Sequence, residues 1–206
     1  MGIERVIIGL VGKPGAGKST FKSTLEAVMR EDDFWPSVGT VKFSDSLFET
    51  LKHYGIPTTR ENLQWLGQQL ESKRADAVTV GFLNKMRETE ENPRKRYEII
   101  IADGVRWLPD ETAIREMGGI MVYIMADPAL RYERVKTRRE KESDESKTWE
   151  EFLKEDQAPN EIHVHEIGCR TDFKIDNNCT IDGYKIQARQ FYQEFIKPLR
   201  NKETPH

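Results

Sequence analysis

One short stretch of the chain has the residue types and spacing needed to bind phosphate groups. It reads Gly12-Lys13-Pro14-Gly15-Ala16-Gly17-Lys18-Ser19 and fits the pattern G-x-x-x-x-G-K-[ST]. The glycines allow a tight curl in which successive backbone N–H groups point to one centre. The lysine ammonium can reach the β- and γ-phosphates of a nucleotide, and the serine hydroxyl can bind Mg²⁺. We therefore predict a nucleoside triphosphate site over this stretch, extended by Thr20.

The elements on either side of this stretch support the prediction. The apolar run 5–11 before it is typical of a buried strand, and 19–30 after it is typical of a helix. A helix that begins near Gly17 adds the positive end of its dipole to the same centre. The alternative is a chance glycine-rich turn, which would need neither a preceding strand nor a following helix.

Two acids follow predicted strands and are candidates for the chemistry. Asp103 ends the apolar run 97–102, where an acid of a phosphate-loop protein can reach Mg²⁺, often through water. Its alternative role is to start the next turn. Asp45 follows the run 41–44 and can hold Mg²⁺, contact the acceptor or polarise an attacking oxygen. Asp45 is equally well placed as the N-cap of a helix that starts near Ser46.

Arginines supply the positive charge that phosphoryl transfer needs around the moving group. Those after or near strand ends are candidate substrate clamps, namely Arg60, Arg74 and Arg106. Further along, Arg131, Arg134, Arg138 and Arg139 recur at helical spacing after a predicted strand. The last three are candidates for closing over the triphosphate as part of a lid. The alternative for each arginine taken alone is a solvated surface position.

Short apolar runs alternate with helical patterns, which predicts a parallel sheet covered by helices on both faces. The predicted strands are 6–11, 40–43, 97–102, 120–125 and 173–175. One long helical region is predicted from a capping box at Thr58 to about Glu90. Leu63, Leu66 and Leu70 recur there at helical spacing and are predicted, with Trp65, to pack in the core.

Composition limits the class of protein. The chain has 206 residues, a formal net charge of −3 and two cysteines. This length predicts one domain, and the charge excludes a nucleic-acid-binding domain of the basic type. No apolar run approaches the roughly 20 residues of a membrane helix, and no signal peptide is recognised. We therefore expect a cytoplasmic protein with reduced thiols, without nucleic acid or membrane as partner.

In the order of its motifs, the chain resembles the nucleoside monophosphate kinase-like group of phosphate-loop kinases. Within that group, it is similar to phage-type deoxynucleoside monophosphate kinases and to dephospho-coenzyme A kinases. The resemblance runs through most of the chain, and only the phosphate loop is specific alone. The segments that carry it are 12–19, 43–47, 59–67, 103–106, 134–138 and 172–178.

The resemblance implies a three-layer α/β fold with a five-stranded parallel sheet, Mg²⁺-ATP as donor and a mobile helical lid. It implies an acceptor-binding helical region at about 45–92 and a lid-like region at about 131–160, within one domain over 1–206. The roles it implies are phosphate and Mg²⁺ binding for Lys18 and Ser19, acceptor contacts for Asp45, Arg60 and Gln64, lid positions for Arg134 and Arg138, and approach to the adenine for Asn177 and Asn178.

Three functions stay open from the sequence. The first is transfer of the γ-phosphoryl group of ATP to a nucleoside or deoxynucleoside monophosphate, by a monomer or homodimer. The second is dephospho-coenzyme A kinase activity, in which the acceptor is a ribose hydroxyl. The sequence departs from that family at Lys13-Pro14, at the lone Asp45 and at Asp103-Gly104-Val105-Arg106, which favours the first function. The third, of another class, is a nucleotide-gated regulatory ATPase.

Overall fold

Five parallel strands form one sheet in the residues described by the structure, a computed structural model that covers 5–92, 96–138 and 147–200. The strand order is β2-β3-β1-β4-β5, and every neighbouring pair is parallel. This confirms the predicted five-stranded parallel sheet. The strands are β1 (Val6–Val11), β2 (Val38–Lys42), β3 (Ile99–Val105), β4 (Ile120–Met125) and β5 (Phe173–Asp176).

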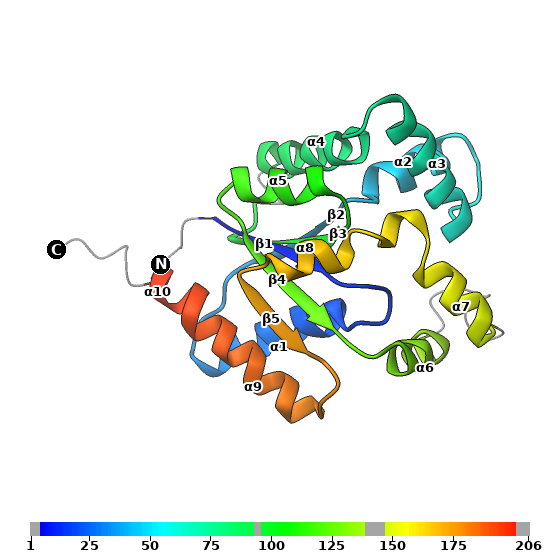
Figure 1. Ribbon diagram of the computed structural model, residues 1–206. Helices are drawn as coiled ribbons and strands as arrows, with labels where there is room; N and C mark the ends of the chain where they lie inside the picture. Colours follow the sequence, from blue (N-terminus) through cyan, green and yellow to red (C-terminus); the bar gives the residue numbers. More distant parts are fainter. Residues whose placement is uncertain (1–4, 93–95, 139–146, 201–206) are drawn as a thin grey trace.

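Helices connect the strands and cover the sheet (Figure 1). The helices before β3 are α1 (Lys18–Glu31), α2 (Asp45–His53), α3 (Arg60–Lys73) and α4 (Ala77–Glu91). The helices between β3 and β5 are α5 (Leu108–Glu116), α6 (Pro128–Arg138), α7 (Trp149–Asp156), the 3₁₀ turn Pro159–Glu161 and α8 (Val164–Cys169). After β5 come α9 (Ile181–Phe191), the π-helical segment Tyr192–Ile196 and α10 (Lys197–Arg200).

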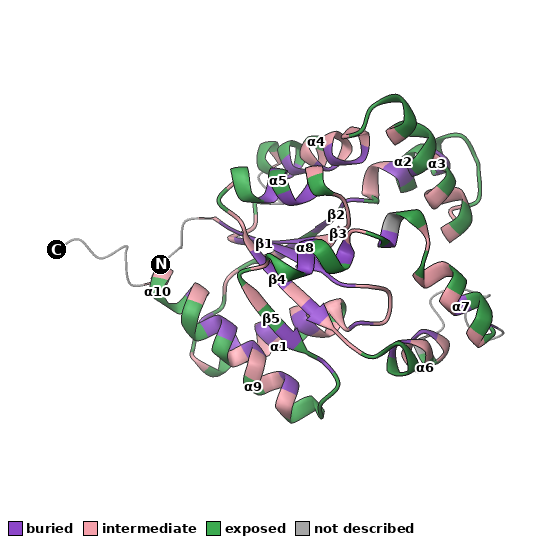
Figure 2. Ribbon diagram, viewed as in Figure 1, coloured by how far each residue is buried: buried purple, intermediate pink, exposed green. Residues whose placement is uncertain are grey.

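Each face of the sheet has its own hydrophobic core. On one face, α1 and α9 pack through Phe21, Leu25 and Phe191. On the other, α4, α5 and α8 pack through side chains that include Phe82 and Ile167. Figure 2 shows the buried residues concentrated on the strands and on the inward sides of these helices. Because both faces are covered, the central strands are continuous apolar runs, which is why the sequence indicates them clearly.

The predicted helix over 59–90 is in fact two helices. The chain leaves the helical conformation at Arg74, which is extended at φ −151° and ψ 112°, and resumes it at Ala77. A salt bridge of 2.6 Å between Arg74 and Asp76 spans the break. The break lets α4 pack on the sheet through Phe82 and Met86 while α3 packs against α4 and α2. Trp65 and Leu70 are 53% and 39% exposed, so their predicted core positions are wrong.

The carboxyl ends of the strands meet at one edge, and the loops there gather the chemistry. Figure 1 shows α6 and α7 beyond this edge, with α2 and α3 beside it. Ligands of open α/β sheets bind at this edge because loops from several strands converge there. Among the described residues, no helix has the length and apolar character that crossing a membrane requires.

Candidate active site

The predicted phosphate loop connects β1 to α1 and is packed tightly from outside. Gly15 and Gly17 adopt φ values of +77° and +106°, which residues other than glycine rarely adopt. A Cβ atom on Gly15 would lie 2.6 Å from the carbonyl oxygen of Arg131, and one on Gly17 would lie 2.2 Å from Nδ2 of Asn177. The loop is therefore held by α6 and by the chain after β5, and both glycines are required sterically.

The chemical side chains of the loop lie at a cavity of about 360 Å³. Nζ of Lys18 donates a hydrogen bond of 2.7 Å to the carbonyl oxygen of Gly12, which keeps its ammonium within the curl. Lys18 and Ser19 both line the cavity, and so does Asp103 from β3, the strand beside β1. Oδ1 of Asp103 is buried and has no hydrogen-bond partner among the described residues. A buried carboxylate oxygen without a donor is costly, which fits a site for a cation.

The cavity extends from the phosphate loop to the region predicted to bind the acceptor. Its wall combines apolar side chains from β2, α2 and α4 with polar side chains of α3 and of the segment after β3. Away from the phosphate loop, the cavity lining includes Phe43, Leu47, Arg60, Leu63, Gln64, Gly67, Gln68, Glu71, Val78, Arg106, Trp107 and Asp110. Three of the predicted acceptor residues, Arg60, Gln64 and Arg106, thus share one cavity with Lys18 and Ser19.

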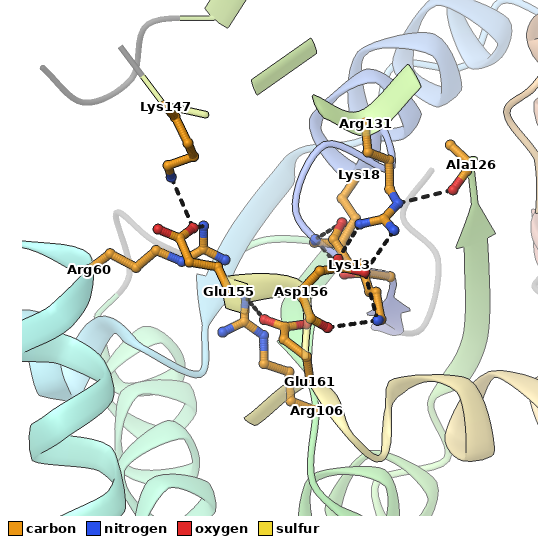
Figure 3. A network of polar contacts seen from close by, with 11 residues as sticks. Lys13, Lys18, Arg60, Arg106, Ala126, Arg131, Lys147, Glu155, Asp156 and Glu161 are labelled. Atoms are coloured by element: carbon orange, nitrogen blue, oxygen red, sulfur yellow. Dashed lines mark hydrogen bonds and ion pairs between the residues drawn. The ribbon is translucent and has the colours of Figure 1, made fainter. Parts of the chain in front are cut away.

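The end of α7 lies between the phosphate loop and α3, and it binds cations of both (Figure 3). Asp156 pairs with Lys13 of the phosphate loop at 3.0 Å and also with the buried guanidinium of Arg131. Glu155 pairs with Arg60 of α3 at 2.6 Å and with Lys147 at 2.9 Å. Burial raises the pKa of Asp156, but hydrogen bonds from Arg131 and Lys13 outweigh it, so the pKa is lowered overall.

The segment after β5 supports the phosphate loop from the other side. Nδ2 of Asn177 donates to the carbonyl oxygen of Ala16 at 2.7 Å. The hydroxyl of Tyr184 donates to the carbonyl oxygen of Gly17 at 3.0 Å. Arg134 of α6 donates to the carbonyl oxygen of Asn177 at 2.9 Å. The side chain of Asn177 thus holds the loop. A contact of Asn177 with adenine, and a contact of Arg134 with phosphate, stay predictions.

Other predicted site residues lie outside the cavity. Arg74 has a side chain that is 64% exposed and is paired with Asp76. The carboxylate of Asp45 accepts a hydrogen bond of 2.8 Å from the backbone N–H of Lys42, and Asp45 is the first residue of α2, whose N-cap is Ser44. Asn178 accepts from the backbone N–H of Asp127 at 2.8 Å. Arg138 ends α6, and its side chain lies outside the described residues, as does Arg139.

Sequence reasoning missed four acids of the site, which are Glu71, Asp110, Glu155 and Asp156. Asp110 is fully buried and accepts hydrogen bonds from Thr79 and from the backbone N–H groups of Arg106 and Trp107. Burial nevertheless raises the pKa of Asp110 to about 6. Glu71 was detectable, because it follows Gln64 and Gly67 on one helical face. The other three carry no local signal in a chain so rich in charge.

Comparison with known proteins identifies the family of the chain. Residues 8–156 match AAA_18, described as an AAA domain. The chain is 31% identical over 196 residues to a UPF0200 protein of Pyrococcus horikoshii, which covers 93% of this chain and 98% of that protein. It is 27% identical over 191 residues to a UPF0200 protein of Hyperthermus butylicus, and this match covers 92% of this chain and 94% of that protein.

Among solved structures, shikimate kinase from Bacteroides thetaiotaomicron has a similar fold. The TM-score is 0.56 at 13% identity, over 91% of this chain and 97% of that chain. At this identity, the likeness shows the fold alone. The fold is kinase-like and of the nucleotide-binding phosphate-loop type, as the sequence predicted.

Proposed function

This chain belongs to the AAA_18 family of AAA domains and to the UPF0200 proteins, and from that premise we propose that it is an ATP-dependent kinase acting on a nucleoside or deoxynucleoside monophosphate. The observation that carries the proposal is the single cavity that joins Lys18 and Ser19 to Arg60 and Arg106. One end of that cavity suits the donor phosphates, and the other end offers cations for an anionic acceptor.

The donor end binds the triphosphate of ATP. Lys18 and the backbone N–H groups of the loop hold the β- and γ-phosphates, and the N-terminus of α1 adds its dipole. Ser19 and Asp103 fit a bound Mg²⁺, because the first offers a hydroxyl at the cavity and the second a buried carboxylate oxygen without a donor. When bound, Mg²⁺ would neutralise charge on the transferring phosphoryl group.

The acceptor end suits a phosphate more than a hydroxyl. A phosphate acceptor is already anionic at neutral pH and needs positioning by cations, whereas a hydroxyl acceptor gains from a carboxylate base. Arg60 and Arg106 line the cavity as cations. Asp45, the acid predicted as a possible base, does not line it and accepts from the backbone of Lys42 instead.

This arrangement predicts a mild effect of Asp45→Asn. We expect the variant to keep turnover within about threefold of the wild type, since an asparagine in the first turn of α2 can still accept from Lys42. Steady-state kinetics with ATP and the best acceptor measure it. A loss of 100-fold or more in kcat, with the KM for ATP unchanged, would identify Asp45 as a base and favour a hydroxyl acceptor such as the ribose of dephospho-coenzyme A.

We also propose that α6 and α7, which overlap the lid-like region at about 131–160, cover the reacting phosphates. Helix α7 packs on α6 through Trp149 and Phe152, whose rings contact Tyr132, and it is also held by the ion pairs of Glu155 and Asp156. Nucleotide phosphates would compete for the same cations, Lys13 and Arg60. Covering the phosphates excludes water and suppresses wasteful hydrolysis of ATP.

The docking of α7 is testable through Asp156→Asn. The amide cannot form the ion pairs with Lys13 and Arg131, so local opening of α7 becomes easier. We expect amide hydrogen exchange in 149–156 to be about tenfold faster than in the wild type. Glu150→Gln is the control, because Glu150 is exposed on the same helix and its loss removes the same charge. Equal exchange in the two variants would assign the docking to the aromatic contacts.

The same ion pairs predict a dependence of this docking on pH. The pKa of Asp156 is lower in the folded protein than in the unfolded chain. The ionised Asp156 therefore stabilises the docking of α7 fully at any pH above the ordinary pKa of an unfolded aspartate. The effect is lost as the pH falls through the lower folded pKa. We therefore expect wild-type exchange in α7, after correction for the intrinsic rate, to increase below about pH 4 and approach that of Asp156→Asn.

An acceptor panel tests the proposed function. Purified protein is incubated with Mg²⁺-ATP and each common nucleoside or deoxynucleoside monophosphate, and with dephospho-coenzyme A, while ADP and the phosphorylated acceptor are measured. Formation of a nucleoside diphosphate supports the proposal. Phosphorylation of dephospho-coenzyme A alone contradicts it, and slow ADP release that no acceptor accelerates indicates a nucleotide-gated ATPase.

A further inference from the structure

One face of α3 presents a graded series of polar groups to the cavity. Six residues of this helix line it, namely Leu63 and five others at spacings of four, three, one and three residues that keep those five on one side. Those five are Arg60, Gln64, Gly67, Gln68 and Glu71. Along the helix, the series runs from a cation through two amides to an acid.

The two ends of this series face different parts of the site. Arg60 begins α3 and pairs with Glu155 of α7, whose neighbour Asp156 pairs with Lys13 of the phosphate loop. Glu71 lies eleven residues further along, which is about 16 Å of helix. Figure 1 shows α3 running from the vicinity of α7 toward α4. An elongated acceptor with a phosphate at the Arg60 end therefore presents its other end to Glu71.

The cavity between the two ends has a mainly apolar wall. Gly67 lies in the interior of α3 and lines the cavity, so the helix backbone itself forms part of the wall. A Cβ atom on Gly67 would lie 3.4 Å from Leu47 and 3.9 Å from Val78, so the glycine brings α3 close to these two side chains. Phe43, Leu47 and Val78 supply apolar wall. Apolar walls with a few polar groups at the rim are typical of sites for heterocyclic ligands.

Glu71 differs from the other acids of the site because it has no protein partner. Asp110, Glu155 and Asp156 each accept hydrogen bonds, whereas no hydrogen bond or ion pair of Glu71 is found among the described residues. Its carboxyl group is half-buried at the cavity. Partial burial and the negative charge of Asp110 together raise the pKa of Glu71 to about 7. A ligand that covers this half-buried carboxyl group removes its remaining water, and an N–H group of the ligand would compensate for that loss.

We infer that Glu71 is the specificity-determining residue of the acceptor site, and that it selects monophosphates whose base carries an exocyclic amino group. This inference rests on the proposed function. The amino N–H of adenine, cytosine or guanine donates to the Glu71 carboxyl group. Uracil and thymine place carbonyl oxygens at their exocyclic positions, and a carbonyl oxygen facing the ionised form of this carboxyl group offers no donor. The uncompensated carboxyl group then weakens their binding.

The test compares acceptor preference in the wild type, Glu71→Gln and Glu61→Gln. Glu61 is exposed in the first turn of the same helix and does not line the cavity, so its variant controls for loss of an acid from α3. Values of kcat/KM are measured with AMP, CMP, GMP, UMP and dTMP at saturating Mg²⁺-ATP. Binding of the same monophosphates is measured by calorimetry in the absence of ATP.

The wild type is expected to prefer its best amino-bearing acceptor over UMP and dTMP by about 10- to 100-fold in kcat/KM. Glu71→Gln should reduce that ratio to within about threefold, because a glutamine amide donates to a carbonyl oxygen as readily as it accepts from an amino group. The KM for ATP should not change. Glu61→Gln should retain the wild-type ratio.

Three results would overturn the inference. The first is a wild type that uses UMP or dTMP as well as any amino-bearing acceptor. The second is a Glu71→Gln variant that keeps the wild-type preference for amino-bearing acceptors. The third is a Glu61→Gln variant that loses this preference as fully as Glu71→Gln does. In these cases phosphorylation of monophosphates still supports the proposed function. If no monophosphate is bound or phosphorylated, the proposed function fails, and the assignment of Glu71 fails with it.

Discussion

Replacing Lys18 by alanine is expected to reduce phosphoryl transfer by about 10³-fold or more while leaving the fold intact. The ammonium lies within the curl of the phosphate loop, where it donates to the carbonyl oxygen of Gly12. It is thus placed to interact with the charge that develops on the phosphates. We expect its role in stability to be small, because its loss removes hydrogen bonds worth about 1 kcal/mol each.

Rapid-quench measurement of a single turnover separates the chemical step from product release for this variant. Lys22→Ala serves as the matched control, because Lys22 lies one turn further along α1, does not line the cavity and makes a long contact of 3.8 Å with Glu26. We expect the control to transfer phosphate at the wild-type rate, and both variants to unfold within a few degrees of the wild type. Near-normal transfer by Lys18→Ala would show that the loop does not bind the donor phosphates.

The phosphate loop and the sheet were predictable because their signals are local. Buried parallel strands are continuous apolar runs, so β1 and β4 have the predicted bounds 6–11 and 120–125. The loop must combine glycines at fixed positions with Lys18 and Ser19, and few other sequences meet that demand. The start of α3 also has a local signal, but its N-cap is Thr59, one residue after the predicted Thr58, and the Thr59 side chain accepts from the backbone N–H of Asn62.

Helix packing was harder to predict because it depends on partners far along the chain. The break between α3 and α4 contains neither glycine nor proline, so no breaker residue marks it. The face of α3 that lines the cavity carries mostly polar side chains, although Leu63 lines it too. The hydrophobic spacing of Leu63, Leu66 and Leu70 had indicated a more apolar inner face. Leu63 and Leu66 do pack against the second core, but Leu70 is left exposed.

The ion pairs across the cavity could not be predicted from spacing at all. Lys13 and Asp156 are 143 residues apart, and Arg60 and Glu155 are 95 apart. The stretch that carries Glu155 and Asp156 contains many acids with the same local surroundings. Only the fold, which brings α7 across the carboxyl ends of the strands, distinguishes these two from their neighbours. For the same reason, Arg131 turned out to be buried in a structural pair while Arg74 is exposed.

Asp103→Asn is expected to lower kcat by about 10²-fold or more and to raise the Mg²⁺ concentration needed for half-maximal activity. Oδ1 of Asp103 is buried at the cavity without a donor, at the end of the strand beside β1. In the absence of a cation, this oxygen carries an uncompensated desolvation cost. An amide is weaker than a carboxylate as a ligand for Mg²⁺, so the variant should bind Mg²⁺-nucleotide poorly rather than misfold.

A thermal shift supplies a second readout that does not depend on turnover. In the wild type, ATP with Mg²⁺ should stabilise the protein more than ATP with a chelator does, because a ligand that binds only the folded state raises its stability. Asp103→Asn should lose most of this difference, and Asp182→Asn, an exposed acid at the start of α9, should keep it. If Asp103→Asn retains both the Mg²⁺ dependence of the rate and the stabilisation by Mg²⁺, then Asp103 does not hold the metal. Its buried carboxylate would in that case have to face the acceptor.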